Sequence, residues 1–147
     1  MSLKRELLKL YIHSVKKGGK ENRSENKIKE IIYNYDDLSD TFGIKVTDGF
    51  HYEKTVEMDD GLLLDFDENN VPVSLEILDA SKRFNLPKKC LKKVVFLRMD
   101  VFVDDKFICL NVLVGVRINN IENKQKIDSY ASNYCNLPNM DVKLALI

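Results

Sequence analysis

Hydrophobic and polar residues alternate with a period of two along most of the chain after residue 30, a period typical of β-strands. Clusters of Asp, Asn and Gly separate the alternating stretches and predict tight turns between them. The residues at 79–84 follow the last of these stretches and predict a short helix. We therefore expect a four- or five-stranded antiparallel unit within residues 30–84. Its expected strands are 31–36, 42–46, 62–66 and 71–77, with a weaker one at 52–58.

The clearest alternation covers residues 95–103 and 108–118, where every second side chain is Val, Leu, Ile or Met. An Asp-rich turn separates the two stretches, so they predict a long hairpin that extends or covers the first unit. The apolar face, which includes Val95 and Val112, is expected to face the core. Arg98 and Asn111 lie on the opposite face, so a one-residue shift of register would bury polar groups.

Two later segments allow more than one prediction. Residues 119–136 fit a strand or a helix, with a slight preference for a strand because their polar alternation continues the hairpin. Residues 139–147 fit a short helix or a last strand.

The N-terminal residues differ in pattern from the rest of the chain. Leucines at three- and four-residue spacing predict an amphipathic helix within residues 1–17. Residues 18–29 are polar, begin with two glycines and read as a linker. We expect a single β-rich domain over 30–147, made of the unit at 30–84 and a C-terminal hairpin extension at 85–147. The predicted class is α+β: a mostly antiparallel sheet or meander, an N-terminal helix and a short helix near 79–84.

Composition limits the classes of function. The chain has 147 residues, of which 44% are hydrophobic, and 23 basic residues balance 23 acidic ones. No apolar run approaches the roughly 20 residues of a membrane span, and the first residues do not resemble a secretory signal, so a cytoplasmic location is expected. The three cysteines include no CxxC pair, which argues against a disulfide framework or a zinc knuckle. We expect no catalytic residues, no metal and no cofactor, and therefore no enzyme.

The neutral total conceals a strong segregation of charge along the chain. Residues 31–80 carry 13 acidic and 2 basic side chains, whereas residues 1–30 carry 9 basic and 4 acidic ones. Residues 81–147 carry 12 basic and 6 acidic side chains. The basic ends can fold back over the acidic middle, or the protein can present one acidic and one basic face to a partner or to a second copy.

Residues 30–84 resemble a known family. The matching features are Tyr35-Asp36, Asp40, Phe42, Gly61, Asp65-Phe66-Asp67, Glu76-Ile77-Leu78 and Ala80-Ser81. In order and spacing they are similar to the domain-of-unknown-function family 2283, which occurs in bacteria and archaea. The resemblance implies a small β-hairpin domain with a terminal helix, no established activity, and a weak suggestion of antitoxin or partner binding. The chain departs from the family at Gly43, where a large aromatic residue is common, and at the turn after Asp67, which lacks a glycine.

Two sets of charged residues are candidates for binding. The acidic set could hold a hard cation or a polar ligand, although Asp in turns more often bonds its own backbone. The basic set could contact nucleic acid or a toxin, although a short run of lysines is more often a solvated face. The acidic candidates are Asp36, Asp40, Asp65, Asp67 and Glu76, and the basic candidates are Lys82, Arg83, Lys88 and Lys89.

From these observations we expect a non-catalytic, self-associating interaction module. A small-molecule or divalent-metal domain that uses the acidic turns is one alternative. A nucleic-acid- or toxin-binding regulator that uses the cluster at 82–93 is another. A homodimer is expected because the strands at 94–103 and 107–118 are poorly blocked if they form sheet edges. A protein partner is compatible with the sequence, whereas a membrane is not expected and nucleic acid is not favoured.

Overall fold

The structure is a computed structural model that describes residues 28–147, in which the chain forms nine strands and two short helices. The first five strands and the helices come from the acidic middle and the basic cluster, and the last four strands come from the C-terminal third. The strands are β1 (Lys29–Asp36), β2 (Thr41–Val46), β3 (Tyr52–Asp59), β4 (Leu62–Asp67), β5 (Pro72–Ile77), β6 (Phe96–Val103), β7 (Phe107–Ile118), β8 (Ile121–Ser132) and β9 (Met140–Ala145). The helices are α2 (Ala80–Phe84) and α3 (Lys88–Leu91).

All nine strands belong to one sheet, in the order β3-β4-β5-β2-β1-β9-β6-β7-β8. Every neighbouring pair is antiparallel except β1 and β9, which pair in parallel through Lys29 with Leu144 and Glu30 with Ala145. This short ladder joins strands that lie at opposite ends of the described chain.

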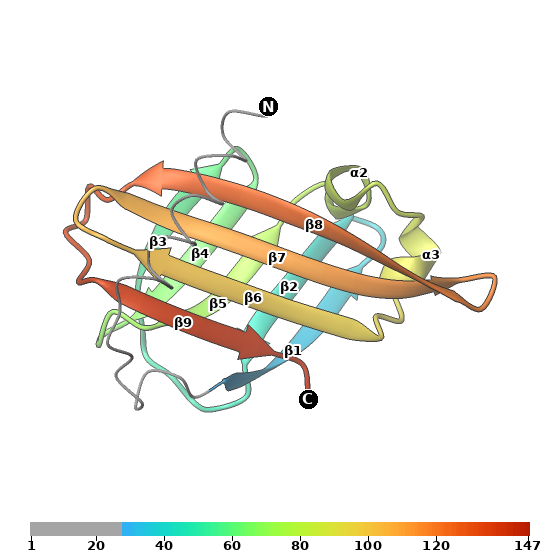
Figure 1. The fold of residues 1–147 in the computed structure, drawn as a ribbon, viewed down its shortest axis with the longest axis horizontal. Helices are drawn as coiled ribbons and strands as arrows, with labels where there is room; N and C mark the ends of the chain where they lie inside the picture. The colour runs from blue at the N-terminus through green and yellow to red at the C-terminus, as the bar shows by residue number, and fades with distance from the viewer. Residues whose placement is uncertain (1–27) are drawn as a thin grey trace, which may run out of the picture.

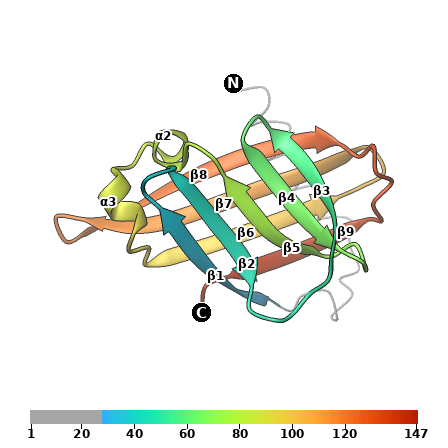
Figure 2. The same cartoon turned by 180° about the vertical axis from the view of Figure 1, so that it is seen from behind.

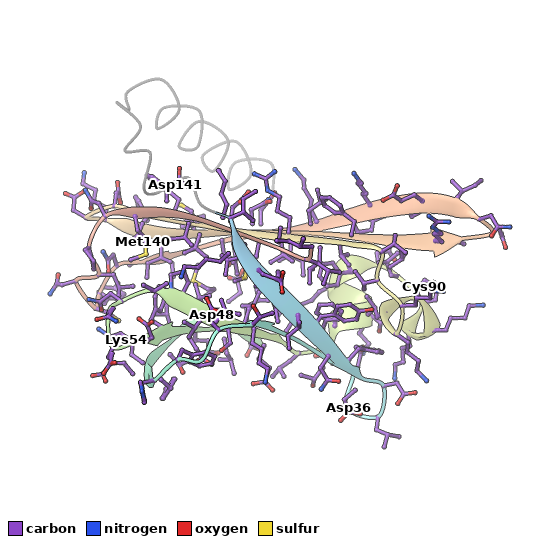
Figure 3. All side chains as sticks on the ribbon, turned by 90° about the horizontal axis from the view of Figure 1, so that it is seen from below. Asp36, Asp48, Lys54, Cys90, Met140 and Asp141 are labelled. Carbon is purple, nitrogen blue, oxygen red and sulfur yellow. The ribbon has the colours of Figure 1, made fainter. Side chains whose placement is uncertain are left out.

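The sheet curls into two layers, as Figures 1 and 2 show. One layer contains β1–β5 and the other contains β6–β9, and β1 passes from the second layer to the first along its length (Figure 3). The two ends of the strand order also meet, because the Ser129 hydroxyl on β8 donates a hydrogen bond to Asp59 on β3 at 2.7 Å. The sheet therefore nearly closes on itself around its apolar interior.

The alternation in the sequence decides which side chains fill this interior. Phe42, Leu64 and Leu75 from the first layer and Met99 and Val112 from the second are at most 1% exposed. Their neighbours along each strand face solvent, as the period of two requires. Helices α2 and α3 lie together at one end of the molecule (Figure 1), and Phe84 of α2 packs edge-on against Phe42 with ring centroids 6.1 Å apart.

The α+β class predicted from the sequence is wrong, because the described chain is largely β. Its two helices have only five and four residues. The predicted N-terminal helix within residues 1–17 and the linker at 18–29, apart from its last two residues, lie outside the described residues. The C-terminal segment forms a full layer of four strands rather than a hairpin alone, because alternation continues through β8 and β9.

Several local predictions are confirmed. The weak stretch at 52–58 is strand β3, the ambiguous segment after residue 119 is strand β8, and the helix predicted near 79–84 is α2. Two details differ: Val95 precedes β6 and is 38% exposed, and α3 had not been expected. A four-residue helix is too short for its periodicity to be recognised in a sequence.

The homodimer is expected from the sequence because β6 and β7 would be unblocked edge strands, and the topology removes this reason. Strand β6 lies between β9 and β7, and β7 lies between β6 and β8, so neither offers a free edge. The edge strands are β3 and β8, and their sequences contain several charged residues, which discourage pairing with another sheet. Any self-association must therefore be argued from the faces of the sheet rather than from these two strands.

Within residues 28–147, no helix has the length and apolar content needed to cross a membrane.

Candidate functional site

The outer face of the β1–β5 layer, which faces the viewer in Figure 2, carries the charge of the acidic middle segment. Inward positions are occupied by the apolar side chains of the core, so the acidic residues at alternate positions point outward. We call this surface the acidic face. Its carboxylates include Glu30, Asp36, Glu57, Asp65, Asp67 and Glu76, and Lys45 is a cation among them.

An open depression of about 630 Å³ lies in the acidic face over β1, β2 and β5. Gly43 forms part of its lining and lies in register with Asn34 on β1 and Glu76 on β5. Asp36, Thr41 and Lys45 also line the depression. Asn34, Gly43 and Glu76 thus lie side by side on three adjacent strands. Because glycine has no side chain, the space between the side chains of Asn34 and Glu76 is open.

Asp65 lies on the same face but is already engaged. Its two carboxylate oxygens accept hydrogen bonds from the Thr55 hydroxyl at 2.6 Å and the Ser74 hydroxyl at 2.7 Å. The Tyr52 hydroxyl lies 2.7 Å from that of Thr55, which extends the network along β3. Asp65 therefore links three adjacent strands across their outer surface.

Asp40 is buried and engaged by neighbouring residues. It is only 6% exposed, and its carboxylate accepts hydrogen bonds from the Tyr35 hydroxyl, the Ser81 amide and the Ser81 hydroxyl. Burial alone would raise the pKa of Asp40, but the hydrogen bonds from Ser81 and Tyr35 outweigh it and lower the pKa below its ordinary value. The pKa of the Tyr35 hydroxyl is raised by burial and by the neighbouring Asp40.

Asp67 is also occupied by local structure. Its Oδ1 atom accepts hydrogen bonds from the amides of Asn69 at 2.8 Å and Val71 at 2.9 Å. This arrangement is the backbone-bonding role that Asp commonly has in turns, and it holds the connection between β4 and β5. Asp36 and Glu76 also line the depression, and neither forms an ion pair among the described residues. Asp36 Oδ1 accepts one hydrogen bond, from the Leu38 amide at 3.0 Å.

The basic candidates lie at the end of the molecule formed by α2 and α3, which we call the basic end. Lys88 donates a hydrogen bond to the Asp37 carbonyl at 3.4 Å, and Lys92 forms an ion pair with the Asp37 carboxylate at 2.7 Å. The hydrogen bond and charge of Lys92 lower the pKa of Asp37. Arg83 donates through Nε to the Leu78 carbonyl at 3.1 Å. These three cations help to hold the end of the molecule together.

The remaining cations of the basic end, Lys82, Lys89 and Lys93, are exposed. Within residues 28–147 none of them pairs with a carboxylate. All three belong to the basic cluster at 82–93 predicted from the sequence, although the spacing of charges does not show which of its lysines Asp37 engages.

Across the described residues, no three His, Cys, Asp or Glu side chains come close enough together to hold a metal ion. Cys90 and Cys109 are buried, and burial, with a smaller effect of Asp104, raises the pKa of Cys109 to about 11. Cys135 is exposed.

Comparison with known proteins agrees with the resemblance of the middle segment. Residues 32–81 match the family described as protein of unknown function (DUF2283). A protein of Methanosarcina mazei named "Putative hypoxanthine phosphoribosyltransferase" is 32% identical over 87 residues, which are 59% of this chain and 70% of that protein. Residues 32–81 therefore form a DUF2283-like domain within the chain.

A second relative covers less of the chain. An uncharacterised protein of Methanocaldococcus jannaschii is 50% identical over 46 residues, which are 31% of this chain and 39% of that protein. No solved structure matches the chain.

The geometry explains much of the family pattern in structural terms. Tyr35, Asp40 and Ser81 form one hydrogen-bonded cluster, although Ser81 is distant from the others in sequence. Phe42 lies in the core, and Gly61 occupies a turn with a φ of 87°. Most of the matching residues thus specify the fold, whereas Glu76 is exposed on the acidic face.

Proposed function

We propose that the protein is a non-catalytic interaction module that self-associates, with the acidic face of one copy placed against the basic end of another. The observation that carries the proposal is the separation of charge in space: carboxylates cover the outer side of β1–β5, and exposed lysines gather around α2 and α3. Complementary charged surfaces steer association and select its orientation.

This contact is head-to-tail, because it uses two different surfaces of the same molecule. A heterologous contact of this kind forms a ring if the rotation closes and an open chain if it does not. We therefore expect assemblies larger than a dimer at low salt, and their dissociation as salt screens the charges.

Sedimentation velocity of the full chain at micromolar concentration tests the proposal. At low ionic strength the mass should exceed 17.0 kDa, and in about 1 M salt, where the Debye length is about 3 Å, it should return to the monomer value. A mass near 17.0 kDa at every protein and salt concentration would overturn the proposal.

Two charge reversals make the test specific. Glu76→Lys should impair the acidic face, and Lys89→Glu should impair the basic end, so each variant alone should be monomeric. A mixture of the two variants should assemble again at low salt, because each variant keeps one intact surface and the two reversed charges are complementary to each other. Asp105→Lys in the turn between β6 and β7 is the control: this exposed residue lies at the end of the molecule opposite α2 and α3 (Figure 1), and the variant should assemble like the unaltered protein.

The name of the Methanosarcina mazei relative raises a purine phosphoribosyltransferase as the competing proposal. Phosphate groups are commonly bound where a glycine-rich loop leads into a helix N-terminus. Here α2 follows β5 through Leu78 and Asp79 and has five residues, so we do not extend that activity to this chain. Nucleotide formation from hypoxanthine and an activated ribose phosphate would contradict the non-catalytic proposal.

A further inference from the structure

Gly43 in strand β2 has no evident conformational or packing reason to be glycine. Its φ does not lie in the left-handed region, and among residues 28–147 an added Cβ would meet only the Asn34 carbonyl oxygen, at an ordinary 3.7 Å. Glycine within a strand destabilises it, and it often marks a place where a ligand or another chain approaches closely. The effect of Gly43 here is to keep the depression open between Asn34 and Glu76.

The lining of the depression suits the side chain of a lysine. A lysine combines an aliphatic stem with an ammonium group that has three donors and no acceptor. Ile32, which is 44% exposed, offers apolar surface to the stem, and Asp36 and Glu76 offer carboxylates to the ammonium group. Lys45 lies at one side of the depression, in register with Ser74. Because its positive charge repels a second cation, an incoming ammonium group is favoured at the other side, nearer Glu76.

We propose that the depression around Gly43 seats a lysine side chain from the basic end of a second copy. This inference rests on the proposed self-association and specifies its central contact. The charges are complementary, and the basic end supplies exposed lysines that are not engaged by a carboxylate within residues 28–147. Lys88 and Lys92 are held by Asp37, which leaves Lys82, Lys89 and Lys93 as the available lysines, and Lys89 of α3 is the one we test.

Filling the depression tests the seat without changing any charge. In Gly43→Leu the new side chain occupies the space, and we expect the full chain to stay monomeric at low salt. Gly49→Leu is the matched control: nothing lies within 4 Å of a Cβ at that position, so this variant should assemble normally. Circular dichroism should show the same folded spectrum and melting transition for both variants.

A peptide separates failure of the seat from failure of self-association. The probe is an acetylated and amidated peptide with the sequence of residues 80–94 and serine in place of Cys90. It should bind the full chain, and Gly43→Leu and Glu76→Gln should each weaken binding by at least about tenfold.

The outcomes are distinct. If the unaltered protein assembles in a salt-dependent way and Gly43→Leu assembles equally well, the seat is wrong and the proposed function stands. If the protein is monomeric but the peptide binds and depends on Gly43, self-association is wrong and the depression is a seat for a lysine of another protein. Absence of both assembly and peptide binding overturns both proposals. If Gly43→Leu does not fold, Gly43→Ala and Glu76→Gln replace it with the same criteria.

Discussion

Asp40 holds Ser81 through two hydrogen bonds, one from the Ser81 amide at 3.0 Å and one from its hydroxyl at 2.6 Å. The backbone adds a third link, because the Ala80 amide donates to the Asp40 carbonyl at 2.9 Å. The turn between β1 and β2 thus acts as a cap for α2, which has no side-chain cap from its own N-cap residue, Asp79. A short helix that is otherwise weakly held is fixed to the sheet by a distant carboxylate.

Asp40→Asn should lower the free energy of unfolding by about 1–3 kcal/mol, because the buried amide replaces an oxygen acceptor with a donor that faces other donors. Asn tolerates the left-handed conformation of residue 40, whose φ is 54°, so backbone strain does not contribute. Urea unfolding measures the change. Asp79→Asn is the control, since Asp79 is exposed, also left-handed and without a capping hydrogen bond, and its substitution should have little effect.

The same carboxylate should make stability depend on pH in the acid range. The pKa of Asp40 is lower in the folded protein than its ordinary value of 3.8, so the stability it contributes is present above about pH 4 and is lost as the pH falls through the folded pKa. The difference in unfolding free energy between the unaltered protein and Asp40→Asn should therefore be largest at neutral pH and shrink toward pH 2. A difference that stays constant between pH 7 and pH 2 would show that the charge of Asp40 does not contribute.

Gly61→Ala should destabilise the protein by about 1–2 kcal/mol, because residue 61 has a φ of 87° and a non-glycine residue is strained there. The added Cβ would also lie 2.9 Å from an Arg83 guanidinium nitrogen and 3.3 Å from the Leu78 Cβ. Gly49→Ala, where a Cβ has open space and φ is not left-handed, should change stability by less than about 0.5 kcal/mol. Equal effects at the two positions, measured by chemical unfolding, would contradict the role of the Gly61 turn.

Val112→Asp should destabilise the protein by more than about 3 kcal/mol, because the side chain is 0% exposed and a carboxylate there has no partner. Ile121→Asp makes the same chemical change on β8, where the side chain is 67% exposed, and should stay within about 0.5 kcal/mol of the unaltered protein. Thermal melting of both variants measures the contrast. Near-normal melting of Val112→Asp would show that this face of β7 is not the core.

Local pattern was sufficient to predict most strands. Alternation placed Val112 inside and Asn111 outside, and the structure confirms both. Pattern did not predict that β9 would lie between β1 and β6, because the pairing of Glu30 with Ala145 depends on the three-dimensional path of the whole chain. The class was wrong for a related reason: it gave weight to a helix in residues that the structure does not describe and too little to the strands after residue 119.

The candidate site was predicted in part. Asp36 and Glu76 were identified from the sequence and lie on the same depression, because the strand period sends both to one face. Asp40, another candidate from the sequence, is buried and bonded to Ser81, a contact that no local spacing reveals. The contribution of Gly43 to the depression required knowledge of its neighbours on β1 and β5.

The central position of β9 has a consequence for how the protein is made. β9 is the last strand of the described chain in sequence order, yet it joins β1 to β6 in the middle of the sheet. During synthesis from the N-terminus, β1–β5 emerge before the strands that cover their apolar inner face, and β1 and β6 have no ladder between them until β9 arrives. Contacts between residues so distant in sequence form slowly during folding. Until they form, unpaired strand edges and exposed apolar surfaces favour aggregation. The β1–β9 ladder therefore closes the sheet only after both layers have been synthesised.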